Sequence, residues 1–190
     1  MSTGIPRADV RAIGPLTRGE FLMLLYWFAD TNAVPEVVGI TGLSRLTRLS
    51  LILGEELGMH RTIEPFFNYY RTPQGGIASP EVWGEVLALR DYQVLETFSV
   101  DEPMPKEEID ERRFILDHHI PVHERSHYPL PTQLQRDVLT NKGTFFAAKR
   151  EDQAIQRTIA IYKTTAELNL RSLSDLTARA LPLAREAATR

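Results

Sequence analysis

Apolar side chains recur at helical spacing in two segments of the N-terminal half. The first segment follows a Thr17-Arg18-Gly19-Glu20 capping box and should end near residues 30–32. The second runs from Thr41 to Leu57, with Gly58 placed to end it. The apolar positions are Phe21, Leu24, Leu25 and Phe28 in the first segment and Leu43, Leu46, Leu49, Leu53 and Leu57 in the second. This pattern predicts two helices, the first of them a core helix.

An aromatic strand, a turn and a third helix are predicted next. Residues 66–71 are rich in Phe and Tyr and break at Pro73-Gln74-Gly75-Gly76, which is typical of a strand entering a loop. Ser79-Pro80 then places serine at an N-cap and proline at the first helical position, so a helix should run to about Asp91. Residues 94–100 predict a short strand.

The rest of the chain has a less regular pattern. Residues 1–15 carry prolines and glycines without apolar periodicity and predict an irregular segment. Residues 101–111 are acidic and contain proline, which favours a loop, and residues 113–120 favour a strand. Apolar spacing predicts a helix over residues 153–168 and a final helix over about residues 173–181.

Composition narrows the class of protein. The chain has 190 residues, 43% of them hydrophobic and 25% charged, which is typical of one globular domain with an extension. No apolar run approaches the roughly 20 residues that a membrane-spanning helix needs, so no membrane partner is expected. The N-terminus lacks the pattern of a secretory signal and the chain has no cysteine. We therefore expect a cytoplasmic protein without disulfides, iron–sulfur clusters or thiol catalysis.

Charge is unevenly distributed along the chain. The net charge is -3, but residues 1–75 hold seven basic and seven acidic side chains, residues 76–117 hold four and eleven, and residues 118–190 hold eleven and seven. The middle is therefore acidic and the C-terminal part basic. Because phosphate neutralisation supplies most of the affinity of DNA-binding domains, only a local basic face of this chain could bind DNA.

Two stretches carry a resemblance to a known family. They are Gly42–Leu53, with its arginine-leucine pattern, and Phe66–Arg71 continuing through Ser79–Trp83. With the order of elements over about residues 17–100, they resemble the winged-helix proteins related to SocA-like antitoxins, also called Panacea domains, and some uncharacterised prokaryotic relatives. Members of that group serve as antitoxins, proteolysis adaptors and regulators.

The resemblance implies an α+β, mostly helical fold with a winged-helix core. We expect that core over residues 16–112, after the irregular segment 1–15. Residues 113–190 are expected to form a mixed strand and helical extension that packs on the core or on a second subunit.

Five side chains are the candidate DNA contacts. Arg45, Thr47 and Arg48 should project from the side of the second helix opposite its leucines, and Arg71 and Gln74 flank the wing-like loop. In a winged helix such residues can read base edges and touch phosphate. The leading hypothesis is a dimeric transcriptional regulator that binds duplex DNA. The ordinary alternative for these residues is a solvated face with weak surface salt bridges.

A second function stays open. If the third helix is the recognition helix, then Glu81, Glu85 and Asp91 would repel phosphate. The chain would then be a protein-interaction module of the antitoxin or adaptor type, which holds a protein partner through exposed aromatic and acidic surfaces. Residues 153–181 could close a homodimer through an apolar helical stripe, or could pack on the chain's own core.

Candidate chemistry is sparse. The most conspicuous cluster of metal-ligand residue types is His118, His119, His123 and His127. Histidines four residues apart on a helix can share a zinc ion, but Pro121 and Pro129 interrupt this segment, so an exposed polar loop is expected instead. The acidic run at residues 107–111 is interpreted as a solvated loop. No nucleophile or phosphate-loop motif occurs, so neither an enzyme nor a cofactor is expected.

Overall fold

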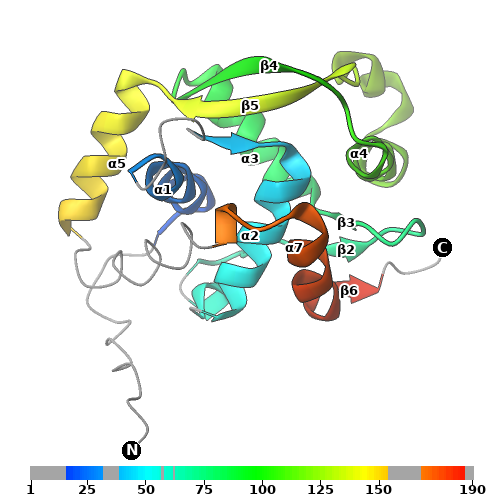
Figure 1. Ribbon diagram of the computed structural model, residues 1–190, viewed down its shortest axis with the longest axis horizontal. Helices are drawn as coiled ribbons and strands as arrows, with labels where there is room; N and C mark the ends of the chain where they lie inside the picture. Colours follow the sequence, from blue (N-terminus) through cyan, green and yellow to red (C-terminus); the bar gives the residue numbers. More distant parts are fainter. Residues whose placement is uncertain (1–15, 32–38, 57, 62, 154–167, 187–190) are drawn as a thin grey trace, which may run out of the picture.

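The protein has an α+β, mostly helical fold (Figure 1). The computed structural model describes residues 16–31, 39–56, 58–61, 63–153 and 168–186. Residues 1–15, where an irregular segment was expected, and most of the predicted helix over residues 153–168 lie outside the described residues.

Three helices supply most of the core. They are α1 (Arg18–Thr31), α2 (Leu43–Glu56) and α3 (Pro80–Asp91). The predicted capping box of α1 is present, since the Glu20 amide donates to Thr17 Oγ1 (3.1 Å) and the Thr17 amide donates to Glu20 Oε2 (2.8 Å). The predicted N-cap of α3 is present as well, with the Val82 amide 3.2 Å from Ser79 Oγ. A 3₁₀ helix, η2 (Met59–Arg61), follows α2.

A three-stranded antiparallel sheet crosses the molecule above these helices (Figure 1). Its strands are β1 (Ile40–Thr41), β5 (Gln133–Leu139) and β4 (Leu95–Pro103), in the order β1-β5-β4. The central strand β5 was not predicted, and β4 is longer than the strand expected over residues 94–100. The sheet joins both parts of the chain, and the division expected after residue 112 falls inside a helix.

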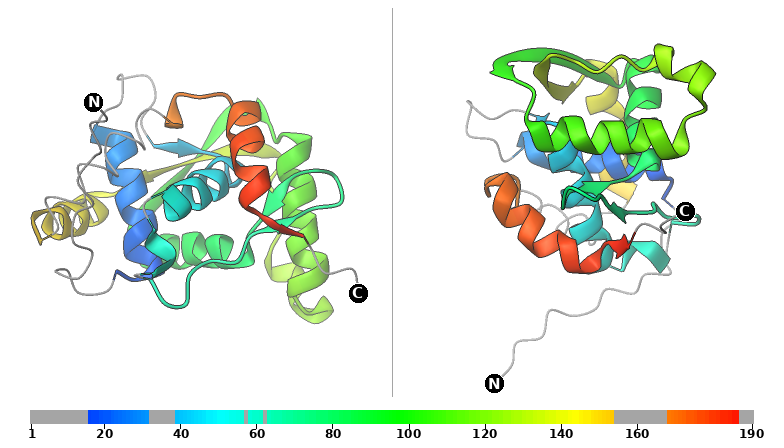
Figure 2. Two further views of the ribbon diagram at one scale, coloured as in Figure 1. Left: turned by 90° about the horizontal axis from the view of Figure 1, so that it is seen from below. Right: turned by 90° about the vertical axis from the view of Figure 1, so that its right-hand side faces the viewer.

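A second small sheet lies beside α4 and α7 (Figure 2). The hairpin strands β2 (Tyr70–Arg71) and β3 (Ile77–Ala78) are antiparallel, and β6 (Arg185–Glu186) runs parallel to β2. Only the last two residues of the predicted aromatic strand belong to β2, and the preceding aromatic side chains pack in or against the core. Phe66 and Phe67, for example, have ring centroids 5.1 Å apart.

Helix α4 (Lys106–His119) corrects two predictions. A loop was expected over residues 101–111 and a strand over residues 113–120, and the structure has one helix across both. The buried face of α4 mixes charged residues with apolar ones, namely Glu108, Glu111, Arg112, Phe114 and Ile115. Because three of these five buried residues are charged, the segment lacks the apolar periodicity by which a helix is recognised. A 3₁₀ helix, η3 (Val122–His127), follows.

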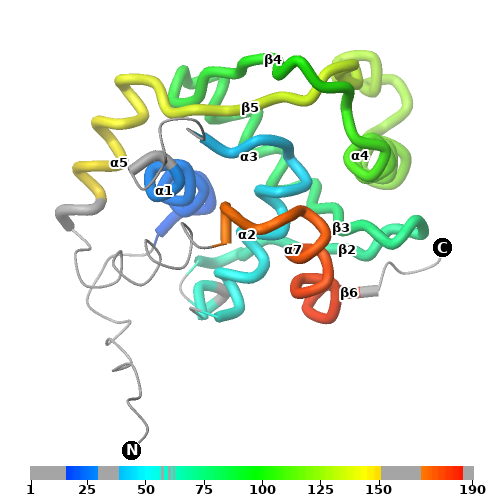
Figure 3. The backbone as a smooth tube through the Cα atoms, viewed as in Figure 1, coloured from blue at the N-terminus to red at the C-terminus, as the bar shows by residue number. Residues whose placement is uncertain are grey.

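The C-terminal elements pack on the same chain. Helix α5 (Asn141–Gln153), which was not predicted, contacts α1. Helix α7 (Leu173–Ala180) confirms the predicted final helix and packs across α2 with Leu176 and Ala180 buried. The short η4 (Leu181–Leu183) leads into β6. The backbone trace in Figure 3 follows this path, with the β2–β3 hairpin between α4 and α7.

None of the helices in the described residues combines the length and the apolar character needed to cross a membrane.

Candidate functional site

Arg48 of α2 is the centre of a buried ionic cluster. Its guanidinium donates to Glu111 Oε1 (2.6 Å) and Glu107 Oε1 (2.5 Å), both on α4. It also donates to Thr177 Oγ1 of α7 at 2.7 Å, so one side chain connects three helices. The Arg48 side chain is 0% exposed. The prediction that Thr47 and Arg48 project from α2 was wrong, since both are buried.

Glu111 connects the same cluster to the hairpin. Its carboxylate accepts hydrogen bonds from the Ile77 amide of β3 (2.8 Å) and from the Ser44 hydroxyl of α2. Burial raises the pKa of the Glu111 carboxyl, and the hydrogen bonds from Arg48 and Ser44 act in the opposite direction. Gly76 lies close to the Glu111 carboxylate, since a Cβ on Gly76 would be 2.4 Å from Glu111 Oε1. Glu111 therefore holds the hairpin against α4.

Glu108 of α4 caps the N-terminus of α2. Its carboxylate accepts from the Leu43 amide (3.1 Å) at the first turn of α2, where backbone donors lack intrahelical partners. Arg112 donates to the same carboxylate (2.8 Å), and its guanidinium lies 5.5 Å from the centre of the Trp83 ring. The acidic run that was interpreted as a solvated loop is thus partly internal to the fold.

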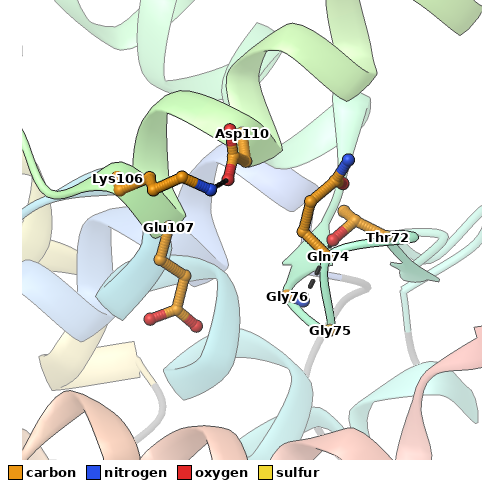
Figure 4. A pocket seen from close by; sticks show the side chains of 7 residues that line it. All are labelled: Thr72, Gln74, Gly75, Gly76, Lys106, Glu107 and Asp110. Carbon is orange, nitrogen blue, oxygen red and sulfur yellow. Dashed lines mark hydrogen bonds and ion pairs between the residues drawn. The ribbon is translucent and has the colours of Figure 1, made fainter.

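A polar cleft opens beside this cluster (Figure 4). It has a volume of about 310 Å³ and is lined by Thr72, Gln74, Gly75, Gly76, Lys106, Glu107 and Asp110. The β2–β3 turn forms one wall and the first turns of α4 form the other. Lys106 and Asp110 pair at the rim with 2.7 Å between nitrogen and oxygen. The Glu107 carboxylate is shared between this cleft and Arg48.

Four of the five predicted DNA contacts are buried or partly buried. Arg45 is half-buried and donates to the backbone oxygens of Asn169 (3.0 Å) and Arg171 (2.8 Å). Burial lowers the pKa of Arg45. Arg71 donates to the Leu181 oxygen at 2.9 Å. Of the five, Gln74 is the one that is exposed, and it lines the cleft.

Helix α3 carries one basic residue, Arg90, and that residue points inward. Its guanidinium makes two 2.9 Å contacts with the carboxylate of Asp137, in the central strand β5. Glu81 is bonded to Asn68 (2.6 Å), and Asp91 is exposed at the end of the helix.

The histidines do not come together as a metal site within the described residues. In the part of the chain that the structure describes, no group of three His, Cys, Asp or Glu side chains could hold a metal ion. His118 stacks on Phe114 with ring centroids 4.4 Å apart, and its Nδ1 is 2.9 Å from the Phe114 oxygen. His123 lies 3.4 Å from Glu124 in η3. His118 and His119 are in the last turn of α4, not in the loop that was expected.

Comparisons of the chain with protein-family models, with curated proteins and with solved structures found no match. The site is therefore interpreted from its own geometry. Sequence reasoning missed Lys106, Glu107 and Asp110 as cleft residues because it placed them in a loop. The i, i+4 pair of Lys106 and Asp110 was the available signal for a helix there.

Proposed function

We propose that this chain is a winged-helix protein that binds another protein, in the manner of an antitoxin or adaptor, rather than a reader of duplex DNA. The proposal rests on where the predicted DNA-contacting side chains lie, on the charge of α3 and on the cleft beside α4.

The winged-helix part of the proposal is supported by the order of the elements. Helix α1, strand β1, helices α2 and α3, and strands β4 and β5 follow one another along the chain. A winged helix likewise combines three helices with a small antiparallel sheet whose last two strands form the wing. In this assignment the wing is the β4–β5 connection, which here contains α4 and η3. The β2–β3 turn with Arg71 and Gln74, which sequence reasoning took for the wing, precedes α3.

The burial of Arg48 is the observation that carries the choice between DNA and protein. Its guanidinium is fully engaged by two carboxylates, a hydroxyl and the Ser44 backbone oxygen inside the fold, so it has no donor left for a phosphate. Arg45 and Arg71 are likewise bonded to backbone oxygens of the C-terminal segment. Most DNA affinity comes from free cationic side chains on one face, and these residues are committed elsewhere.

Helix α3, the recognition helix of the winged-helix assignment, supports the same choice. Arg90 is paired with Asp137, and the exposed end of the helix carries Asp91. An exposed carboxylate near a phosphate backbone lowers the affinity through like-charge repulsion. A protein partner carries no such uniform negative charge.

The polar cleft is the surface that we assign to the partner. Glu107 and Asp110 place two carboxylates along one wall, and the middle of the chain, residues 76–117, carries an excess of seven acidic side chains. Lys106 is 85% exposed, so its pairing with Asp110 can be exchanged for a partner's cation at small cost. The chemistry that fits is a segment with a lysine or arginine that reaches into the cleft.

The DNA half of the proposal is tested with fluorescently labelled random duplex DNA and the purified chain, by anisotropy between about 50 and 200 mM salt. We expect no binding tighter than about 100 µM at about 150 mM salt, which is the weak end of the non-specific DNA affinity of proteins at physiological salt. Binding that is tighter, and that weakens steeply as salt increases, would overturn the proposal in favour of the regulator.

The protein half is tested by affinity capture from the source cells, followed by titration calorimetry with the captured protein. Asp110→Lys reverses one charge in the cleft, and Glu102→Lys makes the same change on the exposed end of β4. We expect Asp110→Lys to weaken binding at least tenfold and Glu102→Lys to leave it unchanged. Equal binding by the two variants would place the partner elsewhere and contradict the assignment of the cleft.

A further inference from the structure

An aromatic patch lies at the other end of the molecule from the cleft. Tyr92 is 69% exposed, Phe145 is 64% exposed and Phe146 is 43% exposed. Tyr92 follows α3 and the two phenylalanines belong to α5, which lies far from α4 in the views of Figures 1 and 2. Single exposed apolar residues are ordinary on soluble proteins, but three large aromatics together indicate an interaction surface.

The contacts between α5 and the turn after α3 make this a continuous surface. Lys142 Nζ donates to the Tyr92 oxygen at 2.7 Å, and Thr140 Oγ1 donates to the Gln93 oxygen at 2.7 Å. A Cβ on Gly143 would lie 2.3 Å from the Val94 oxygen, so glycine is needed for this close approach. The turn and the first turn of α5 are therefore held together, and we name the surface they carry the aromatic patch, comprising Tyr92, Phe145 and Phe146.

The exposed face of α5 has a regular pattern. Lys142, Phe145, Phe146 and Lys149 stand at positions i, i+3, i+4 and i+7, which places them along one side of the helix. The opposite side carries Gly143 and Ala147, which are buried. The aromatic patch therefore has lysines along its α5 side.

Two exposed carboxylates lie close to Tyr92 in the sequence. Asp91 immediately precedes Tyr92, and Glu96 follows it at the start of β4, and both are exposed. The exposed residues near the aromatic patch thus include lysines on α5 and carboxylates on either side of Tyr92 in the sequence. Because the surface carries charges of both signs, a twofold axis through it can pair lysines of one copy with carboxylates of the other, which is the self-complementarity that an isologous interface requires.

We infer that the aromatic patch is the interface of a homodimer, in which Lys149 of one copy faces Asp91 of the other. An aromatic side chain buries about 150–250 Å² when fully covered, and these three are 43–69% exposed. Covering what is still exposed removes roughly 260–440 Å² from each copy, about a third to a half of the roughly 800 Å² per partner in an interface of standard size. This inference does not depend on the proposed function, because the cleft lies at the opposite end of the molecule.

The mass of the chain in solution tests the inference, by light scattering and sedimentation at about 1–100 µM. We expect the wild type to be a dimer and Phe145→Ser combined with Phe146→Ser to be a monomer. Leu170→Ser combined with Leu183→Ser is the matched control, because it removes two exposed apolar side chains elsewhere, and it should remain a dimer. Thermal unfolding of all three should agree within a few degrees, since each change is on the surface.

A charge exchange tests the pairing across the interface. Asp91→Lys and Lys149→Glu should each weaken dimerisation several-fold, and the two together should restore it. A wild type that is monomeric throughout this range would overturn the inference, and it would leave the protein-binding proposal standing. A Phe145→Ser, Phe146→Ser variant that is still a dimer would also overturn the inference. The dimer interface would then have to lie elsewhere, with residues 153–181 as the next segment to test.

Discussion

The guanidinium of Arg48 and the carboxylate of Glu111 lie 2.6 Å apart, with side chains 0% and 5% exposed. The two residues are 63 positions apart in the sequence and belong to α2 and α4. A buried ion pair gives little net stability compared with apolar residues, but removing one partner leaves an uncompensated charge in the interior.

Removing the positive partner should therefore destabilise the protein strongly. We expect Arg48→Met to lower the free energy of unfolding by about 3–5 kcal/mol, measured by urea denaturation. Arg48→Met combined with Glu111→Gln should cost less than the sum of the two single changes, because the buried position 111 then carries no unpaired charge and glutamine still accepts the hydrogen bond from the Ile77 amide. Strict additivity in this cycle would show that the two side chains are not coupled.

Two helical glycines should respond in opposite directions to the same substitution. A Cβ on Gly54 of α2 would lie 2.5 Å from the Phe66 ring, whereas a Cβ on Gly84 of α3 would meet nothing within 4 Å. We expect Gly84→Ala to raise the free energy of unfolding by about 0.5–1 kcal/mol through helix propensity. Gly54→Ala should lower it by about 1–3 kcal/mol, because the packed ring must move. Equal and stabilising effects at both positions would contradict the packing of Phe66 on α2.

The cap of α7 is testable with neighbouring serines. Ser172 Oγ accepts from the Asp175 amide at 3.1 Å, and Ser174 is exposed within the same helix. We expect Ser172→Ala to cost about 1 kcal/mol and to speed amide hydrogen exchange in α7, because one end donor loses its acceptor. Ser174→Ala removes the same hydroxyl without a cap and should change stability by less than about 0.5 kcal/mol. Similar exchange rates in the two variants would show that the cap does not stabilise α7.

Tyr69 should make stability depend on alkaline pH. Burial raises the pKa of its hydroxyl well above the ordinary value of 10, and the hydroxyl donates to Ser50 Oγ at 3.0 Å. The unfolded chain loses this proton near pH 10 while the folded chain keeps it, so the stability present below pH 10 is lost as pH rises beyond it. The loss approaches about 1.4 kcal/mol per pH unit for one proton.

Tyr69→Phe isolates this contribution from the other titrating groups. Urea denaturation of both proteins at pH 8, 10 and 11 should give a shallower alkaline loss for Tyr69→Phe, whereas at pH 8 the variant is less stable by the lost hydrogen bond. Parallel loss of stability in the two proteins would mean that Tyr69 ionises as readily in the folded chain as in the unfolded one.

Prediction from sequence was correct where the residues that determine an element lie within a few positions of one another. The helices α1 and α3 begin at Thr17 and Ser79 as expected, because a cap needs a side chain and an amide only two or three residues away. It failed for α4, where Glu108, Glu111 and Arg112 occupy buried positions that a sequence pattern reserves for apolar residues. Their partners, such as Arg48 and the Leu43 amide, are on α2 and could not be read from the segment itself.

The sequence by itself determined the three core helices, the turn before α3 and the final helix, because caps, apolar spacing and turn residues act between near neighbours. Only the tertiary structure decided that Arg48 points inward, that β5 is the central strand of its sheet, and that Lys142 of α5 contacts the Tyr92 oxygen. Each of these depends on a contact between segments far apart in the chain. A charged side chain that is buried and paired with a residue far away in the sequence stabilises the fold, whereas an exposed one is available to bind another molecule. The residue type alone does not decide between the two.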